Sequence, residues 1–177
     1  RTYDEMVQEK LPLRYNGKWT APAKDCDADG QGNPFACYMY GLFLAEVAVD
    51  TATGKTTMEK MTIVGDIGVV NNYSLVDGQV YLAQGIGLAL TEDYEDLKKH
   101  ATIRGAGIPY IKDIPDDMEI IYVETPRPAG PFGASGVGEM PLTAPHAAVI
   151  NAIYNACGAR VRELPALPEK VLAAMKK

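Results

Sequence analysis

The chain has 177 residues, which suits a single domain, and 47% of them are hydrophobic, an ordinary share for a globular protein. Its 17 basic and 23 acidic side chains give a formal net charge of −6. This balance argues against a general nucleic-acid-binding protein, because phosphate binding needs clustered Lys and Arg. No apolar run approaches the roughly 18 residues of a membrane span, and no signal peptide is recognisable. The chain begins with Arg1 rather than Met, as a fragment or a processed product would.

The three cysteines, Cys26, Cys37 and Cys157, are scattered and form no CxxC pair. An odd, dispersed set favours structural thiols in a reducing compartment. We therefore expect a cytoplasmic location, with the periplasm as the alternative. Because His100 and His146 are the only histidines, a zinc or iron site built from this chain alone is not expected.

The amino-terminal part predicts one short helix and then loops. Residues 2–10 are expected to be helical, because Thr2 can cap the helix and Glu5, three residues later, completes a capping box. Residues 11–32 are rich in proline, glycine and aspartate, which indicates turns. An acidic cluster there resembles part of a calcium loop but lacks the spaced glutamate of an EF-hand, so a solvated loop is favoured. The cluster consists of Asp25, Asp27 and Asp29.

A β-hairpin is predicted next. Residues 38–49 are apolar and aromatic, which suits a buried strand, and residues 50–54 have the composition of a turn. Residues 56–67 return as a second strand. Glu46, inside the first strand, is expected to face outward or to lie at the sheet edge.

Residues 74–90 are predicted to form one helix, because apolar side chains recur near helical spacing. These side chains are Val80, Ala83, Ile86 and Leu90. Three glycines interrupt the segment: Gly78, Gly85 and Gly87. Each costs about 1 kcal/mol relative to alanine inside a helix. A close approach should therefore require them, either by a packed neighbouring element or by a cofactor.

Further elements follow. Residues 118–124 predict a strand, and PLTAPHAAVINAIYNACG, which ends at Gly158, predicts one helix. Thr143 is its expected N-cap, Pro145 suits its first turn and Gly158 is its expected stop.

Residues 159–161 have the composition of a short strand, and residues 168–176 that of a terminal helix. A hairpin, helices and a further strand predict an α+β fold. We expect a two-layer sandwich, in which a mixed or antiparallel sheet carries helices packed on one face.

The stretch GPFGASGVGE, residues 130–139, concentrates four glycines before a single carboxylate. A glycine-rich loop that leads into a helix offers backbone N–H groups to an anion. A nucleophile elbow would need glycine two residues after Ser135, where Val137 stands. No Gly-Lys-Ser/Thr follows, and the third glycine of a dinucleotide fingerprint is missing. Taken alone, the stretch favours a tight connection with a solvated Glu139.

The longer stretch GPFGASGVGEMPLTAPHAAVINAI closely resembles the last conserved segment of the molybdenum hydroxylases, the family of xanthine oxidase and aldehyde oxidoreductase. The resemblance continues, in family order, through GDIG followed by NN, DGQ, AQGIG and LP followed by PEKVL. It implies that residues 1–177 are a molybdopterin-binding domain, the carboxy-terminal fragment of a longer chain. Family members usually carry a Gly-Gly step between the positions of Tyr81 and Leu82. Its absence leaves the register between Gln79 and Gln84 open.

The resemblance also implies the site. In that family the glutamate at the position of Glu139 is a base that takes a proton from a hydroxyl on molybdenum, without being a metal ligand. The glutamine at the position of Gln79 contacts the dinucleotide part of molybdopterin cytosine dinucleotide. For Gln84, a packing amide is an equally good interpretation. The other residues implied to contact the cofactor, besides Glu139, are Ser135, Gly136, Val137 and Gly138.

The implied reaction oxidises aldehydes to carboxylic acids with water as the oxygen source. Electrons would leave through 2Fe-2S clusters elsewhere, because this chain has no cluster-binding cysteine pattern. The implied partners are an aldehyde, the remaining molybdopterin and iron–sulfur domains, and a second copy in a homodimer. Neither nucleic acid nor a membrane is expected as a partner, and the fragment alone should be inactive. Two alternatives remain: a purine or N-heterocycle hydroxylase of the same family, and a non-catalytic α+β interaction module.

Overall fold

The structure is a computed structural model that describes residues 1–81 and 84–176. The chain divides into two compact units, Arg1–Ala36 and Cys37–Lys177. No helix in the described part of the chain is long and apolar enough to span a membrane.

The first unit contains a single helix, α1 (Tyr3–Gln8). The predicted capping box is confirmed: the Thr2 hydroxyl accepts from the Glu5 N–H, and the Glu5 carboxylate accepts from the Thr2 N–H at 2.8 Å. The rest of the unit is irregular, as expected, apart from an isolated antiparallel bridge between Lys24 and Asn33.

The acidic cluster of this unit is an exposed, hydrogen-bonded turn. Oδ1 of Asp27 accepts the N–H groups of Asp29 at 3.0 Å and Gln31 at 2.9 Å. Among the described residues, no group of three or more His, Cys, Asp or Glu side chains is arranged to hold a metal ion. Asp27 therefore acts on its own backbone, as aspartates in turns commonly do.

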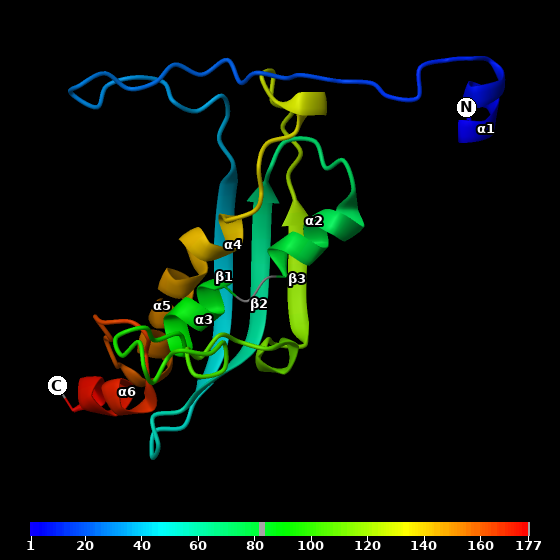
Figure 1. Ribbon diagram of the computed structural model, residues 1–177. Helices are drawn as coiled ribbons and strands as arrows, with labels where there is room; N and C mark the ends of the chain where they lie inside the picture. Colours follow the sequence, from blue (N-terminus) through cyan, green and yellow to red (C-terminus); the bar gives the residue numbers. More distant parts are fainter. Residues whose placement is uncertain (82–83, 177) are drawn as a thin grey trace. The chain divides into compact units, whose positions relative to one another are not determined.

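The second unit is built on a mixed three-stranded sheet (Figure 1). Strand β1 (Tyr40–Val49) pairs antiparallel with β2 (Thr56–Asp66), and β3 (Asp117–Tyr122) lies parallel to β2. The predicted hairpin and the predicted mixed sheet are confirmed. A bulge follows Glu46, which is exposed on an edge strand, as expected.

The turn between β1 and β2 has a local cause. The Asp50 carboxylate accepts the N–H groups of Ala52 at 2.9 Å and Thr53 at 3.3 Å. Gly54 adopts a φ of +77°, and a side chain there would collide with the carbonyl of Pro168. Glycine is therefore needed both for the backbone conformation and for the close approach of the carboxy-terminal segment.

Helices cover one face of the sheet, which confirms the two-layer arrangement (Figure 1). In chain order they are α2 (Tyr73–Val80), α3 (Gln84–Leu90), α4 (Met140–Thr143), α5 (Pro145–Cys157) and α6 (Pro168–Met175). Two short 3-10 helices, Ile111–Asp113 and Pro131–Gly133, lie in the connections. The core between the layers includes Met61 and Ile63 of β2, Val80 of α2, and Val149 and Ile153 of α5.

The opposite face of the sheet is exposed and partly apolar. The pairing aligns Leu42 of β1 with Val64 of β2 and Ile121 of β3 across this face. Tyr40 and Leu44 lie on the same face of β1, and they are 62% and 57% exposed. Side chains on this face therefore alternate with core side chains, as the strand repeat of two requires.

The prediction of one helix over residues 74–90 is wrong. The segment contains two helices, α2 and α3, and the intervening positions 82 and 83 lie outside the described residues. The predicted helical position of Ala83 and the question of the missing Gly-Gly step at Leu82 therefore lie outside them too. Helix α2 ends where its C-cap, Tyr81, leaves the helical conformation (φ −67°, ψ 2°), and α3 then packs against α5. A side chain at Gly85 would lie 2.6 Å from Cβ of Pro145, so α3 must approach α5 closely.

The helix that follows the glycine-rich loop also differs from the prediction. It is broken at Ala144 (φ −134°, ψ −18°), because a residue before proline is disfavoured in the helical conformation. Thr143 is not the N-cap, since its hydroxyl donates to the Met140 carbonyl at 3.0 Å. Pro145 in the first turn and Gly158 at the end (φ 76°) are confirmed.

No strand forms at residues 159–161, which the structure describes as irregular. Ala159 and Val161 are 0% and 7% exposed and pack in the core. Their apolar character reflects this packing rather than pairing within a sheet.

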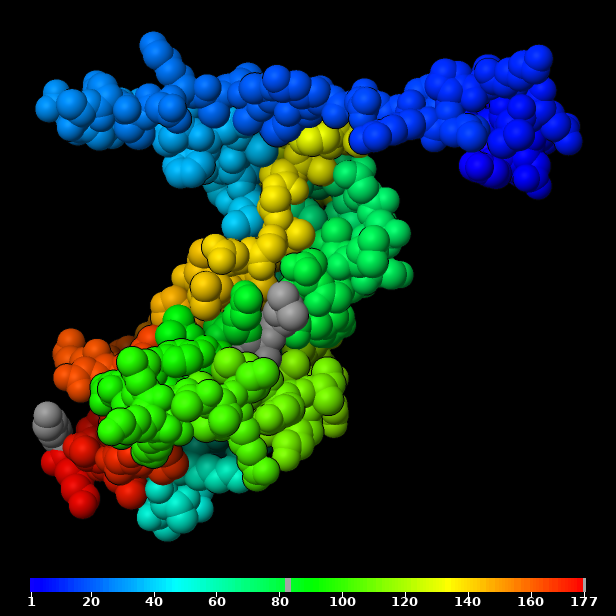
Figure 2. Space-filling view, viewed as in Figure 1, coloured from blue at the N-terminus to red at the C-terminus, as the bar shows by residue number. Residues whose placement is uncertain are grey.

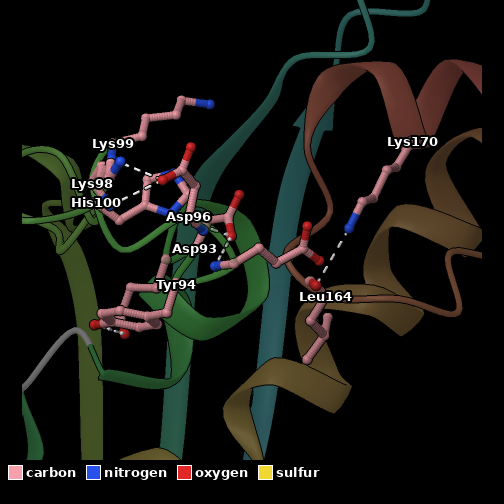
Figure 3. Close-up of polar contacts among 10 residues, drawn as sticks. Asp93, Tyr94, Asp96, Lys98, Lys99, His100, Leu164 and Lys170 are labelled. Atoms are coloured by element: carbon pink, nitrogen blue, oxygen red, sulfur yellow. Dashed lines mark hydrogen bonds and ion pairs between the residues drawn. The ribbon is translucent and has the colours of Figure 1, made fainter.

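The long connection between α3 and β3 is organised by local polar contacts (Figure 3). The Asp96 carboxylate accepts the N–H groups of Lys98 at 2.9 Å and Lys99 at 3.2 Å. The His100 ring, 4% exposed, lies 3.7 Å from Asp93. These contacts fix a segment that has little regular structure of its own.

Candidate cofactor site

The first half of the glycine-rich loop is fastened to the end of the sheet. The carbonyl of Gly133 accepts the N–H groups of Val69 at 3.0 Å and Arg127 at 2.9 Å. The N–H of Ser135 donates to the carbonyl of Ile67 at 2.7 Å. The loop is therefore held by the segment that directly follows β2.

Glycines in this half of the loop, and Gly68 beneath it, are required by the packing of the protein itself. Gly68 has a φ of +74°, and a side chain there would collide with the Gly133 carbonyl. A side chain at Gly130 would collide with the Ala134 carbonyl. Phe132 adopts a left-handed φ of 53° and is 89% exposed. A non-glycine residue in this conformation is strained.

The second half of the loop is open. Gly136 and Gly138 are exposed, and a Cβ atom placed on either would meet no described atom within 4 Å. Neither glycine has a positive φ. Because neither packing nor backbone conformation explains these glycines, they leave room for a ligand to approach the backbone.

Glu139 stands at the end of this open half, immediately before α4, and its side chain is exposed. The next residue, Met140, is 1% exposed. It lies over Gly41 of β1 and Gly65 of β2, where a Cβ atom would come within 3.1 and 3.0 Å of its side chain. The carboxylate is thus held next to a buried anchor while remaining accessible.

Asp66 forms an Asx turn, since its Oδ1 accepts from the Gly68 N–H at 3.1 Å. The structure adds an ion pair between Asp66 and Arg127, with Oδ1 and a guanidinium nitrogen 2.9 Å apart. Partial burial acts to raise the pKa of Asp66. Hydrogen bonds from Thr125 and Gly68 and the charge of Arg127 outweigh burial, so the pKa lies below its usual value. This carboxylate is therefore a structural anion.

The second predicted contact, Gln79, lies on α2 and is exposed. Its neighbour Gly78 would also accept a Cβ atom without meeting any described atom within 4 Å. Helix α2 contacts α4, whose first residue follows Glu139. Figure 2 shows α2 in green and the glycine-rich loop in yellow to orange on the same side of the unit. The structure therefore brings the helix of Gln79 beside the start of α4.

The glycines of α3 behave differently from Gly78. A side chain at Gly85 would meet Pro141 and Pro145, and one at Gly87 would lie 2.6 Å from Cδ of Pro109. Of the two explanations that the sequence left open, packing therefore accounts for the α3 glycines. Of the three glycines in residues 74–90, only Gly78 leaves open space beside a predicted cofactor contact.

Helix α2 is held by contacts that the sequence did not signal. The Tyr122 hydroxyl donates to the Asp77 carboxylate at 2.8 Å, and the Tyr73 hydroxyl donates to Glu124. The two tyrosine rings meet edge to face, with centroids 5.7 Å apart. Burial and the neighbouring Asp77 raise the pKa of Tyr122, which keeps its hydroxyl a donor. Asp77 lies in the DGQ segment, but nothing in that pattern identifies its partner.

The remaining predicted residues take different roles. Ser135 is half-buried, and its Oγ atom is buried without a hydrogen-bond partner among the described residues. Val137 is partly buried and packs against the core. Gln84 is exposed at the start of α3. Nδ1 of His146 lies 3.2 Å from the Leu142 carbonyl, which fits a packed histidine.

These features fit a phosphate-bearing cofactor. The unpaired Ser135 hydroxyl and the exposed Gln79 amide can donate hydrogen bonds without adding charge. The open backbone at Gly136 and Gly138 permits close approach. A separate hollow of about 390 Å³ lies by the β1–β2 turn, at the other end of β2. None of the predicted site residues lines it.

Comparison with known proteins agrees with this class of site. A family model described as a molybdopterin cofactor-binding domain matches residues 1–115. The chain therefore belongs to the family of molybdopterin cofactor-binding domains. The matched range ends before the glycine-rich loop, so the likeness of the loop depends on longer relatives.

The longer relatives are molybdenum hydroxylases, which confirms the family that the sequence predicted. Aldehyde oxidoreductase of Megalodesulfovibrio gigas is 60% identical over 99% of this chain, which corresponds to 20% of that relative. The crystal structure of the aldehyde oxidoreductase from Desulfovibrio desulfuricans matches with a TM-score of 0.86 and 75% identity, covering 97% of this chain and 19% of the other. The large subunit of nicotine 6-hydroxylase from Paenarthrobacter nicotinovorans is 36% identical over 73% of this chain and 17% of that subunit. This chain thus spans about a fifth of the relatives that it matches.

Proposed function

We propose that the chain is the carboxy-terminal, cofactor-binding part of a molybdenum hydroxylase that oxidises aldehydes to carboxylic acids with water as the oxygen source. The single observation that carries this proposal is the open segment Gly136–Glu139, which presents backbone and a carboxylate beside a fastened loop. Support for an aldehyde comes from the likeness to aldehyde oxidoreductases at 60% and 75% identity.

The molybdopterin cofactor, when bound, supplies the redox chemistry and acidifies the water-derived oxygen. The contribution of this chain is to hold the cofactor and to move a proton. Glu139 is the proposed general base: its exposed carboxylate takes the proton from the oxygen nucleophile as that nucleophile attacks the aldehyde carbon. A base needs a heavy-atom distance of roughly 2.6–3.2 Å to the proton donor in the reacting complex. The buried Met140 next to it fixes the backbone from which the carboxylate reaches.

Binding of the cofactor is assigned to neutral groups of this chain. We propose that Gln79 donates to the phosphate region of the cytosine dinucleotide form of molybdopterin. Ser135 donates its hydroxyl hydrogen, and the backbone of Gly136, Val137 and Gly138 lies against the cofactor. These groups give direction to the hydrogen bonds without adding a charged side chain to the phosphate contacts.

The other steps require the rest of the protein. Electrons leave through 2Fe-2S clusters that we place outside this chain, which spans about a fifth of its relatives. The exposed apolar sheet face around Leu42 and Ile121 is the surface that we assign to the remaining molybdopterin domains. Large exposed apolar patches commonly mark such contacts. We expect the complete protein to form a homodimer.

A second candidate is hydroxylation of an N-heterocycle, because the nicotine 6-hydroxylase large subunit is 36% identical to this chain.

The test of the proposed function uses the complete protein, purified anaerobically. Stoichiometric molybdenum and pterin, and rapid reduction by an aldehyde but not by a purine or a pyridine, would support the proposal. Reduction by the heterocycle alone would favour the second candidate. Absence of molybdenum and pterin from the folded protein would favour the non-catalytic interaction module.

A further inference from the structure

An ion pair lies beneath the glycine-rich loop, between residues that are far apart in the sequence. Asp66 ends β2, and Arg127 follows β3. A guanidinium nitrogen of Arg127 lies 2.9 Å from Oδ1 of Asp66, and the two side chains are only 10% and 17% exposed. Because both are largely buried, water and salt weaken this pair less than they weaken pairs at the surface.

Both partners also bind backbone groups. Oδ1 of Asp66 accepts the N–H groups of Gly68 at 3.1 Å and Thr125 at 3.2 Å. Arg127 donates to the carbonyls of Asp66 and Thr125, each at 3.0 Å. The planar guanidinium can serve several acceptors at once, which an ammonium group cannot do in the same geometry. The pair therefore joins the end of β2 to the segment after β3.

Arg127 extends this connection to the loop and to β1. Its N–H donates to the Gly133 carbonyl at 2.9 Å, which fixes the first half of the loop. Its guanidinium lies over the Tyr40 ring of β1, 5.5 Å from the centroid. Arg127 thus contacts β1 and the end of β2 through its side chain, and the loop through its backbone N–H, which the side-chain contacts hold in place.

We propose that Asp66 and Arg127 form a clamp that positions the glycine-rich loop on the end of the sheet and thereby places Glu139 for catalysis. The link to catalysis rests on the proposed function of Glu139 as the base. Between Ser135 and Glu139 the chain passes two exposed glycines that nothing described packs against. The position of the carboxylate therefore depends on the fixed points around these glycines, which are the clamped loop, Val137 packed against the core and the buried Met140.

The first arm of the test measures the clamp without any reference to activity. In the complete protein, Arg127→Met keeps an unbranched stem and removes the guanidinium. We expect faster hydrogen exchange at the amides of Val69 and Ser135, which hold the loop. Exchange in α5 should not change. Unchanged exchange at Val69 and Ser135 in a folded Arg127→Met protein would overturn the clamp, whatever Glu139 does.

The second arm tests the link to Glu139 in protein shown to be fully loaded with molybdenum. A displacement of about 1 Å at a reacting group can slow a reaction roughly 10²-fold. We therefore expect reduction of the molybdenum centre by an aldehyde to slow by up to that factor in Arg127→Met. In the Glu139→Gln background, Arg127→Met should cause no further loss, because the clamp then has no base to position. Fully additive losses would overturn the positioning role.

Milder variants guard against misfolding. Arg127→Lys retains the charge but lacks the planar guanidinium. Its hydrogen-exchange rates in the loop and its rate of reduction by an aldehyde should lie between those of wild type and Arg127→Met. Asp66→Asn retains an acceptor for the Gly68 and Thr125 N–H groups but removes the ion pair, and it should change both measurements in the same direction. Wild-type exchange in both variants would contradict the clamp.

The matched control is Arg160→Met. Arg160 also lies over an aromatic ring, Tyr154, at 3.8 Å, and donates to Asn151 at 2.8 Å, but it has no hydrogen bond to the loop. Arg160→Met should leave hydrogen exchange at Val69 and Ser135, and the rate at which an aldehyde reduces the molybdenum centre, at wild-type values. If Arg160→Met loosened the loop as much as Arg127→Met, the specific role of Arg127 would be refuted. If Glu139→Gln left the rate unchanged, the proposed base would fail, and the exchange arm would still decide the clamp.

Discussion

The two halves of the glycine-rich loop use the same residue for opposite purposes. In the first half, as at Gly68 beneath it, a side chain at Gly130 would collide with the backbone of the loop. In the second half, Gly136 and Gly138 face open space. A glycine-rich sequence therefore does not by itself indicate a ligand. Gly136 and Gly138, which no packing inside the protein requires, are the glycines at which we propose that the cofactor approaches the backbone.

The largest effect that this contrast predicts falls on Glu139, at the end of the open half. Glu139→Gln keeps the size of the side chain but cannot accept a proton as a carboxylate does. We expect reduction of the molybdenum centre by an aldehyde to slow by roughly 10²–10⁴-fold in fully metallated protein. Glu139→Asp should also be impaired, because the shorter side chain withdraws the base. A wild-type reductive rate in Glu139→Gln would show that Glu139 is not the base.

The next effect compares one alanine substitution in each region. Gly68→Ala forces a left-handed φ, worth about 1–3 kcal/mol, and adds a collision with the Gly133 carbonyl. It should lower the free energy of unfolding by at least that amount. Gly138→Ala should change this free energy by no more than about 0.5 kcal/mol but reduce the cofactor content. Denaturant unfolding and molybdenum analysis measure the two effects. Equal destabilisation by both substitutions would contradict the distinction between packed and open glycines.

A smaller effect is expected at Gln79, beside the open glycine of α2. Gln79→Ala removes a hydrogen bond to a charged group, worth roughly 1.5–3 kcal/mol. Molybdenum should therefore be lost faster on extensive dialysis, while the stability of the cofactor-free protein stays near wild type. Gln8→Ala is the matched control, since Gln8 is also an exposed glutamine on a helix and is not a predicted cofactor contact. Molybdenum retention equal to that of wild type would remove Gln79 from the site.

The smallest expected effect is the pH dependence of the stability that Asp66 contributes beneath the first half of the loop. The pKa of Asp66 is lower in the folded protein than the value of about 3.9 expected when unfolded. The unfolded state therefore takes up this proton first as the pH falls, so the stabilisation present above about pH 4 is lost as the pH drops through the folded pKa. Acid unfolding curves of wild type and Asp66→Asn should converge below about pH 4. A difference between them that does not change with pH would contradict this assignment.

Local patterns predicted the local parts of the structure. The hairpin follows from the apolar residues of β1 and β2 and from the turn at Asp50. The capping box at Thr2 and the helix stop at Gly158 are also local signals. The α+β layers follow because the strands and the helices of the second unit bury apolar side chains against each other.

Tertiary contacts decided what the sequence could not predict. The requirement for glycine at position 85 comes from its close approach to Pro145, which is distant in the chain. Ala159 and Val161 are apolar because they pack in the core, although short apolar segments also suit strands. The pairing of Asp66 with Arg127 has no local signature at all. For the site, the resemblance supplied Gln79 and Glu139, whereas only the structure separated the open glycines from the packed ones.

The exposed face of the sheet has a consequence for mutational experiments. Leu42 and Leu44 are 53% and 57% exposed in this chain. A saturation screen for stability of the isolated chain would rank polar substitutions at these positions as tolerated. The same screen on the complete protein should rank them as damaging, if the remaining domains cover this face as proposed. The difference between the two rankings, position by position, would outline the buried contact area without a structure of the assembly.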